Sequence, residues 1–283
     1  MIMNSDLRKR TVRTFFNNKA ALFGLAISII VVVICVSAPF LPIPDPIDQS
    51  MANRFRPPGK NYPLGTDNFG RDVLSRIIWG GRISMMVGVL SVGVAMILGT
   101  IIGLVAGYKG GYTDNITMRI IDVLMCFPTL ILGILFMAAL GSGMRSLIIA
   151  IGIAMTPRFV RICRGSVLGV KENDFVQAAR SMGMTNARIM FRHILPNVIG
   201  DMIVMGTLWV GAIIIFEASL SFIGLGVPPP IPSWGRMVKE GINFLSHAYW
   251  VSVYSGLAIF VTVIGFNLLG DGLRDIMDPK LRE

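Results

Sequence analysis

Four long stretches without a charged residue dominate this chain of 283 residues and restrict what it can fold into. Each is long enough to cross a lipid bilayer, which takes about 20 residues of α-helix. Inside a bilayer a segment must satisfy its own backbone hydrogen bonds, so these stretches are expected to be helices. They are residues 20–44, 83–108, 123–144 and 241–270, of which the last is expected to span from 248 to 270.

Two further spans are predicted although charged residues interrupt them. Only 12 uncharged residues separate Arg145 from Arg158. Arg158 and Arg161 can extend toward the lipid headgroups, so this helix is expected to reach residue 163. The other span, 197–219, contains two acids 16 residues apart, which is roughly 24 Å along a helix and places them near opposite membrane faces. The chain is therefore predicted to be an all-α integral membrane protein with about six transmembrane helices.

The composition agrees with a bilayer environment. Hydrophobic residues make up 53% of the chain and charged residues only 15%, whereas a soluble domain carries about a quarter. The net charge of +10 does not indicate nucleic-acid binding, because the basic residues lie between apolar runs and form no stripe with exposed aromatics. The three cysteines have no metal-ligand spacing, so no metal or redox site is predicted.

Basic residues set the expected orientation of the chain in its membrane. Of the 26 lysines and arginines, 17 fall on one side of the six predicted spans and 9 on the other, and the richer side is expected to be cytoplasmic. Both termini then lie in the cytoplasm. The expected organisation is a basic cytoplasmic segment (1–19), a first transmembrane helix (20–42), an external segment (43–82), a core with five spans (83–271) that contains a cytoplasmic loop (164–196) and an external insertion (220–249), and a cytoplasmic tail (272–283).

A small residue recurs at every fourth position of the second apolar stretch. Ala95, Gly99, Gly103 and Gly107 share one helix face and allow another backbone to approach closely. Tight helix packing is predicted for this face, and the alternative is that it lines a pore.

The external segments are rich in proline. Six prolines between 42 and 63 exclude a regular helix or a central strand. After them, Thr66 or Asp67 is predicted to cap a short interfacial helix at 73–78, and the alternative is a ligand-binding loop. This loop lacks the residue spacing of a phosphate-binding loop.

The second external segment carries prolines at 228–230 and 232, which force an extended backbone. Trp234, Tyr249 and Trp250 follow, and such aromatic residues suit a membrane interface. The alternative is a docking surface for an external partner that includes Pro229 and Trp234.

The predicted cytoplasmic loop is unusually well organised. Asp174 and Gln177 have the spacing of a capping box, and Gly183 suits a helix stop, which predicts a short helix over 175–182. Thr185 is expected to open a second helix that ends before Pro196. One side of the short helix is apolar and must pack either into a groove on another protein or against the ends of the chain's own spans; it carries Val176, Ala179 and Met182.

The same loop resembles the "EAA" loop of bacterial ABC importer permeases. The family pattern is Glu-Ala-Ala, three residues, Gly, nine residues and Ile-x-Leu-Pro, and here Pro196 lies thirteen residues after Gly183, as that pattern requires. Gln177 replaces the glutamate and His193 occupies the isoleucine position, so an ionic contact by that glutamate has no counterpart. The resemblance implies that the coupling residues are Asp174, Gln177, Ala178, Ala179, Gly183, Leu195 and Pro196.

Further motifs along the chain are similar to one subfamily, the second ("C" type) permease of dipeptide, oligopeptide and nickel importers. They are Leu-Gly-Thr-Asp at 64–67, Gly-Arg-Asp at 70–72, Arg-His-Ile-Leu-Pro-Asn at 192–197, Glu-Ala-Ser-Leu-Ser-Phe at 217–222, Ser-Trp-Gly at 233–235, Gly-Asp-Gly-Leu-Arg-Asp at 270–275 and Asp-Pro at 278–279.

This resemblance implies a type I ABC importer permease fold and a set of partners. A homologous second permease would form the other half of the pore, two cytoplasmic ATPases would bind ATP and magnesium, and an external binding protein would deliver the substrate. The chain itself has no Walker motif and is expected to hold no cofactor. Peptides are the expected substrate, and nickel, metal chelates and glutathione are the alternatives.

The residues favour neither a secondary transporter nor an enzyme. A secondary transporter usually places charges at mid-membrane, whereas Asp201 and Glu217 are predicted near the ends of a span. Glu217 is a candidate for the substrate pathway, with Ser219 and Ser221 beside it, and the alternative is a structural hydrogen-bond partner. An enzyme is not expected, because the two histidines fall on opposite predicted sides of the membrane.

Overall fold

The computed structural model describes residue 16 and residues 18–277, and the described chain is built from helices and loops. Five helices are long and apolar enough to cross a membrane, and a bent pair makes a sixth span if it is counted as one. The predicted all-helical membrane fold is confirmed. The spanning helices are α2 (Lys19–Val36), α3 (Val73–Lys109), α6 (Met144–Val170), α9 (Leu195–Ile223) and α11 (Leu245–Met277), and the bent pair is α4 (Gly111–Cys126) with α5 (Thr129–Leu140).

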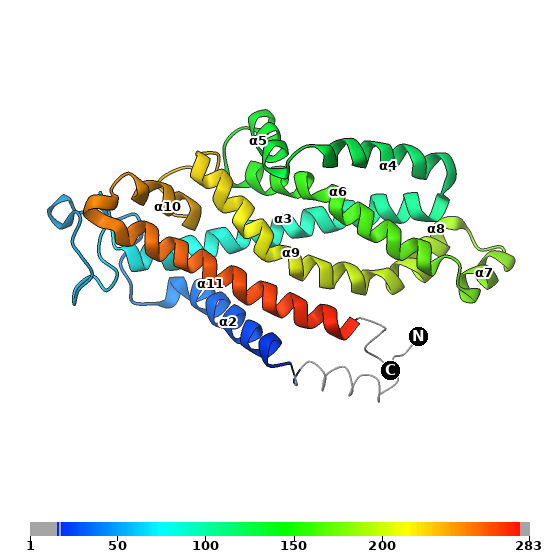
Figure 1. Cartoon of the computed structure of the whole chain (residues 1–283), viewed down its shortest axis with the longest axis horizontal. Helices are drawn as coiled ribbons and strands as arrows, with labels where there is room; N and C mark the ends of the chain where they lie inside the picture. Colours follow the sequence, from blue (N-terminus) through cyan, green and yellow to red (C-terminus); the bar gives the residue numbers. More distant parts are fainter. Residues whose placement is uncertain (1–15, 17, 278–283) are drawn as a thin grey trace.

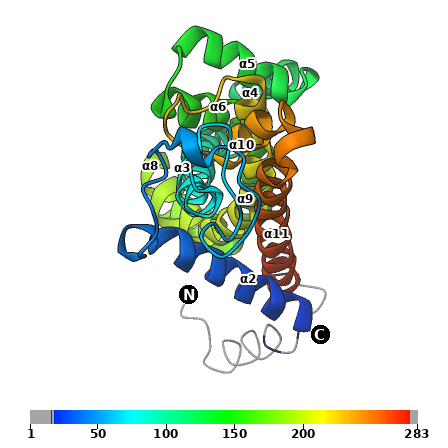
Figure 2. The same ribbon diagram turned by 90° about the vertical axis from the view of Figure 1, so that its left-hand side faces the viewer.

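The helices form one elongated bundle with distinct ends (Figure 1). One end carries α7 (Asp174–Ser181) and α8 (Asn186–Arg188), and the other carries α10 (Trp234–Ile242) with the loops that follow α2. α2 packs along α11 on one side of the bundle, and α4 and α5 lie on the opposite side (Figures 1 and 2). Short 3-10 turns lie at Ala38–Phe40 and Met51–Asn53, and a π-helix at Ile189–Ile194 precedes α9.

The third predicted span is broken. The pattern predicts one helix over 123–144, but α4 and α5 meet at an angle of 97° around Phe127 and Pro128. A proline forces the preceding residue out of the helical region, and Phe127 is extended, with φ −86° and ψ 138°. The break turns α5 away from α4 and opens a space over α6.

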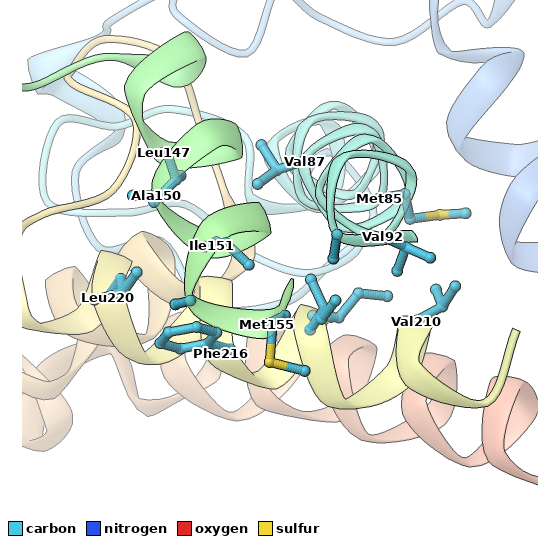
Figure 3. Close-up of a cluster of buried hydrophobic side chains, with 14 of the residues drawn as sticks. Met85, Val87, Val92, Leu147, Ala150, Ile151, Met155, Val210, Phe216 and Leu220 are labelled. Carbon is cyan, nitrogen blue, oxygen red and sulfur yellow. The ribbon is translucent and has the colours of Figure 1, made fainter. Parts of the chain in front are cut away.

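The hydrophobic core lies where α3, α6 and α9 meet. Figure 3 shows Val87 of α3, Ile151 of α6 and Phe216 of α9 converging on one cluster. All three side chains are buried, and Val87 and Ile151 are fully so. These three helices are therefore the rigid centre against which the other elements are placed.

The small residues of α3 form the contact with α6, as predicted for close packing. A Cβ atom on Gly103 would lie 2.7 Å from the carbonyl oxygen of Val160. A Cβ atom on Gly107 would lie 3.0 Å from Cβ of Val167, and one on Gly99 would overlap Phe159. The two helix backbones can approach this closely only because the facing residues of α3 lack side chains.

We expect Gly99→Ala to lower the thermal unfolding temperature of the purified protein, because overpacking a tight interface costs about 1–3 kcal/mol. Gly93→Ala is the matched control on the same helix, since nothing lies within 4 Å of its Cβ position. The measurement is the unfolding temperature in detergent. If Gly99→Ala unfolds at the same temperature as Gly93→Ala and the unchanged protein, the close contact between α3 and α6 at Gly99 is wrong.

The start of α3 differs from the prediction for the external loop. Asp72 is the N-cap, and its side chain accepts a hydrogen bond from the backbone N–H of Ser75. The residues expected to form a separate helix at 73–78 are the first turns of the 37-residue α3. Thr66 or Asp67 as the cap is therefore wrong, because Asp72 immediately precedes the helix. Burial raises the pKa of the Asp72 carboxyl, and hydrogen bonds from the backbone N–H groups of Ser75 and Leu74 oppose that shift.

Candidate functional site

The short helix α7 lies at one end of the bundle, beyond the ends of the long helices (Figure 1). Its N-cap is Asn173, whose side chain makes no capping bond, and Asp174 is the first helical residue. Gln177 donates its side-chain amide to the carbonyl of Glu172 at 3.2 Å. The predicted capping box is wrong, because the helix begins one residue earlier than the motif requires.

One side of α7 packs on the chain's own helices. Val176 and Ala179 are fully buried in a cluster that includes Val167 of α6, Ile194 of the π-helix and Val198 of α9. Met182 was expected on the same side, but it is the C-cap and its side chain is 68% exposed. The helical spacing does not hold at Met182, because the chain leaves the helix there.

The side of α7 next to this buried side leaves apolar groups uncovered. Phe175 is 42% exposed, and Ala178 and Met182 are also exposed. We call these three residues the open apolar face of α7. A large apolar side chain at the tip of a two-turn helix indicates a surface for another protein.

The C-terminal end of α7 agrees with the predicted stop. Gly183 has φ +71°, a conformation that favours glycine, and its backbone N–H donates to the carbonyl of Arg180 at 2.9 Å. The Thr185 hydroxyl accepts from the backbone N–H of Arg188, so it caps the next helix as predicted.

That second helix does not end before Pro196. It passes through α8 and the π-helix directly into α9, and Pro196 lies in the first turn of α9. The π-helix ends at Ile194, just before Pro196, so the chain passes the proline by a local widening of the helix and not by ending it, which explains the difference from the prediction. Leu195 and Pro196 therefore join the loop rigidly to a membrane-crossing helix.

Tyr108 at the end of α3 was not identified from the sequence. Its hydroxyl donates to the Asn186 side chain of α8 at 2.9 Å, and the Arg180 guanidinium of α7 lies 5.2 Å from its ring centroid. Lys171, just after α6, donates to the carbonyl of Gly107 at 3.2 Å. Contacts from α7 and from the segments on both sides of it therefore meet at the end of α3. The sequence around Tyr108 gives no sign of this role. Only its contacts with residues more than 70 positions further along the chain identify it.

The candidate pathway residues of α9 do not share one cavity. Glu217 is fully buried and accepts a hydrogen bond from the Ser221 hydroxyl at 2.6 Å. The Ser233 hydroxyl donates in turn to that of Ser221 at 3.4 Å, which joins α9 to the start of α10. Ser219 is half-buried and lines a separate cavity of about 370 Å³ with Phe222 and residues of α5 and α10. In this structure Glu217 has the contacts of a structural hydrogen-bond partner.

Two of the three aromatic residues expected at the membrane interface are buried. The Trp234 side chain is 2% exposed and its indole N–H donates to the carbonyl of Ile77 at 2.8 Å. The Trp250 indole donates to the carbonyl of Thr66 at 3.0 Å. Only Tyr249 among them is exposed. The two tryptophans hold the loops at the α10 end of the bundle in place, because their N–H groups need partners once buried.

Burial also removes Trp234 from any docking surface, since a partner cannot contact its side chain. Pro229 is exposed and lines a cavity of about 300 Å³ together with Arg236, Lys239 and Glu240.

A buried network of charges lies beside Trp234 at the same end of the bundle. Arg76 is 1% exposed and donates to Glu240 of α10 at 3.0 Å. Arg71 donates to Asp67 at 2.6 Å and to Glu240 at 3.2 Å, and Arg236 donates to the other oxygen of Glu240 at 2.8 Å. The network joins residues 67–76 to α10, which lies more than 150 residues further along the chain.

Charges also cluster along α6, on the side that α4 covers. Arg164 forms two hydrogen bonds with Asp114 of α4. Arg161 forms a 2.6 Å ion pair with Asp122, and the two side chains are 53% and 60% exposed. Arg158 was expected to extend along α6 toward the headgroups, but it does not. It turns toward α5 and α9 instead.

The sequence matches two described protein families. Residues 99–283 match the family "Binding-protein-dependent transport system inner membrane component", and residues 7–58 match the "N-terminal TM domain of oligopeptide transport permease C".

Curated relatives resemble nearly the whole chain. A dipeptide transport system permease protein of Alkalihalophilus pseudofirmus is 41% identical over 94% of this chain and 87% of the relative. An oligopeptide transport system permease protein of Bacillus subtilis is 39% identical over 98% of this chain and 91% of its own length. A glutathione transport system permease protein of Pectobacterium atrosepticum is 47% identical over 80% of this chain and 75% of its own.

Solved structures share the fold. A chain of the MetNI methionine ABC transporter in inward-facing conformations superimposes with a TM-score of 0.59, covering 72% of this chain and 97% of that one at 15% identity.

Proposed function

Because this chain belongs to the family of binding-protein-dependent transport system inner membrane components, and is a multi-pass permease of an ABC importer, we propose that it forms half of a peptide-conducting pore. The other half would be a homologous second permease. Two cytoplasmic ATPases, which bind ATP and magnesium, would drive transport, and an external binding protein would deliver the peptide. The relatives named for dipeptide, oligopeptide and glutathione transport support this substrate class, since glutathione is itself a tripeptide.

The open apolar face of α7 carries the proposal that ATPases drive this chain. It is an apolar surface at the tip of the bundle, held by Val176 and Ala179, which pack with side chains of α6 and α9. We assign direct contact with the ATPase to Phe175, Ala178 and Met182. The remaining coupling residues would then hold α7 in position or transmit its movement to the long helices. These are Asp174, Gln177, Ala179, Gly183, Leu195 and Pro196.

The side of the bundle formed by α4, α5 and α6 is proposed to face the second permease and the pore. The half-exposed ion pair between Arg161 and Asp122 lies on this side, and charged groups facing lipid are unfavourable. α2 on the opposite side has no charged residue after Lys19 and exposes Phe23, Ile30 and Val33, which suits lipid. The charge distribution supports a permease with one side in lipid and the other covered by protein or water.

The end that carries α7 is proposed to be cytoplasmic, with both termini on that side. The lysine and arginine excess in residues 161–192 supports this orientation. The end that carries α10 and Pro229 would then face the binding protein. The segments 1–15 and 278–283, which hold most of the predicted basic terminus and part of the predicted tail, lie outside the described residues.

Co-purification tests this function directly. The tagged chain is produced together with the other subunits of its transport system, extracted in mild detergent and reconstituted into lipid vesicles. We expect two ATPase subunits to be retained and labelled dipeptide to enter the vesicles only with ATP and binding protein. Uptake by the isolated chain, or uptake that needs no ATP, would show that it is a secondary transporter.

A further inference from the structure

Three arginines follow one another along α6 at intervals of three residues, and one of them differs from the others. Arg161 and Arg164 each form an ion pair with a carboxylate of α4. Arg158 forms none with any residue of the described chain, 16 and 18–277. Arg158 is therefore a cation without a counter-ion, whereas its two neighbours are neutralised.

The position of Arg158 makes a missing counter-ion expensive. α6 runs from Met144 to Val170, so its middle residue is Pro157 and Arg158 lies next to the midpoint of a helix long enough to span. A cation at the centre of a bilayer costs about 2.5–3.5 kcal/mol even on the most lenient scale. Ionisable groups in such places face a water-filled or ligand-filled space, which predicts one beside Arg158.

A cavity of that kind is present. It has a volume of about 380 Å³ and lies at the break between α4 and α5, over α6. Arg158 and Thr129 supply polar side chains, and most of the other lining residues are apolar, among them Met125, Phe127, Leu132 and Ala154, although polar atoms make up the larger part of the surface that faces the cavity. Its volume falls within the range of about 300–1,000 Å³ that is typical of small-molecule sites.

The guanidinium of Arg158 is held by contacts that leave its charge uncompensated. One terminal nitrogen donates to the Thr129 hydroxyl of α5 at 3.0 Å, and the other contacts the Met155 sulfur at 3.4 Å. Its central carbon lies 4.7 Å from the ring centroid of Trp209 of α9. A guanidinium has five N–H donors in a planar fork that matches a carboxylate, so donors remain for an anion.

We infer that Arg158 binds the carboxylate of a peptide in transit through this cavity, while the apolar walls accommodate its side chains. The inference rests on the proposed peptide permease function and deepens it by naming the group recognised. Peptides of different lengths and side chains share a free α-carboxylate, so a single cation on apolar walls can serve all of them. A guanidinium that is already oriented by Thr129 and Trp209 loses little freedom when it binds.

The test compares peptides with and without a carboxylate. The permease pair with its ATPases is purified in detergent without the binding protein, and its unfolding temperature is measured with dialanine or with dialanine amide. We expect dialanine to raise the unfolding temperature of the unchanged complex and of Arg158→Lys, but not of Arg158→Gln. The amide should raise it in none of them. Arg161→Gln, which removes the paired arginine one turn away, should respond as the unchanged complex does.

Uptake into vesicles gives a second readout. The ratio of Arg158→Gln to unchanged rates is taken for each peptide, so that the preference of the binding protein cancels. We expect dialanine uptake to fall about tenfold to a hundredfold, as for the loss of one hydrogen bond between charged groups, and amide uptake to stay within twofold. An equal fall for both peptides would assign Arg158 a purely structural role and overturn the inference.

Each remaining result also decides the question. Stabilisation of the unchanged complex by dialanine and its amide alike, or by neither, overturns the carboxylate site even if Arg158→Gln fails to assemble. If the unchanged complex takes up no peptide with ATP, the proposed function itself fails. If it takes up peptides without regard to the carboxylate, only the role of Arg158 fails.

Discussion

Met182→Glu on α7 should release the ATPase subunits and abolish ATP-driven uptake, while the permease itself remains folded. Met182 is 68% exposed in the isolated chain, so the substitution removes no internal packing. In the complex it would place an unpaired charge where an apolar side chain is buried. Burying a methionine contributes about 1.5–3 kcal/mol and burying a lone charge costs more, so association should weaken at least a hundredfold. The measurement is the amount of ATPase retained on the tagged permease.

Met51→Glu is the matched control for this prediction. Met51 is 63% exposed, close to the value for Met182, but it lies in the external segment at the opposite end of the bundle. ATPase retention should be unchanged. Gly183→Trp should also release the ATPase subunits. Its φ of +71° is unfavourable for any residue with a side chain, so the end of α7 should be distorted, while the open Cβ position means that the indole does not clash within the chain. Full ATPase retention by Met182→Glu would remove α7 from the interface.

Arg76→Ala should lower the free energy of unfolding by about 3 kcal/mol and detach the external segment from α10. The guanidinium is 1% exposed and bonds Glu240 of α10 and the carbonyl of Pro46, with Asp67 3.4 Å away. Removing one partner of a buried ion pair costs about 3–5 kcal/mol, and the lower end applies because Arg71 still pairs with both carboxylates. The measurements are the unfolding temperature and protease cleavage within 43–72.

Arg82→Ala on the same helix is the control for this effect. Arg82 is exposed, and its guanidinium lies 5.7 Å from the ring centroid of Trp79 in a cation–π contact. Such a contact contributes about 0.5–1 kcal/mol at an exposed site, so its loss should barely change the unfolding temperature. High salt should not reproduce the Arg76→Ala effect, since buried pairs are poorly screened. Equal behaviour of the two variants would contradict a structural role for the buried network.

The membrane class, the number of spans and the loop that carries α7 were all predictable from the amino-acid sequence. These features depend on local properties: apolar runs of sufficient length, the glycine at 183 that stops a helix, and small residues repeated along one face of α3. The same holds for the family resemblance, which depends on residues in a fixed order along the chain. All of these features can be identified without knowing which residues are in contact in the folded protein.

The tertiary structure alone decided which side of each element is covered. Arg76 and Glu240 pair across 164 residues, and nothing near either residue signals the other. Periodicity placed Met182 with Val176, but the helix ends at Ser181 and the side chain points to solvent. The sequence pattern treats Arg158 and Arg161 alike. In the structure Arg161 pairs with the Asp122 carboxylate of α4, whereas Arg158 faces the cavity at the 97° break between α4 and α5. Burial and pairing are properties of three-dimensional contact, which a linear pattern does not contain.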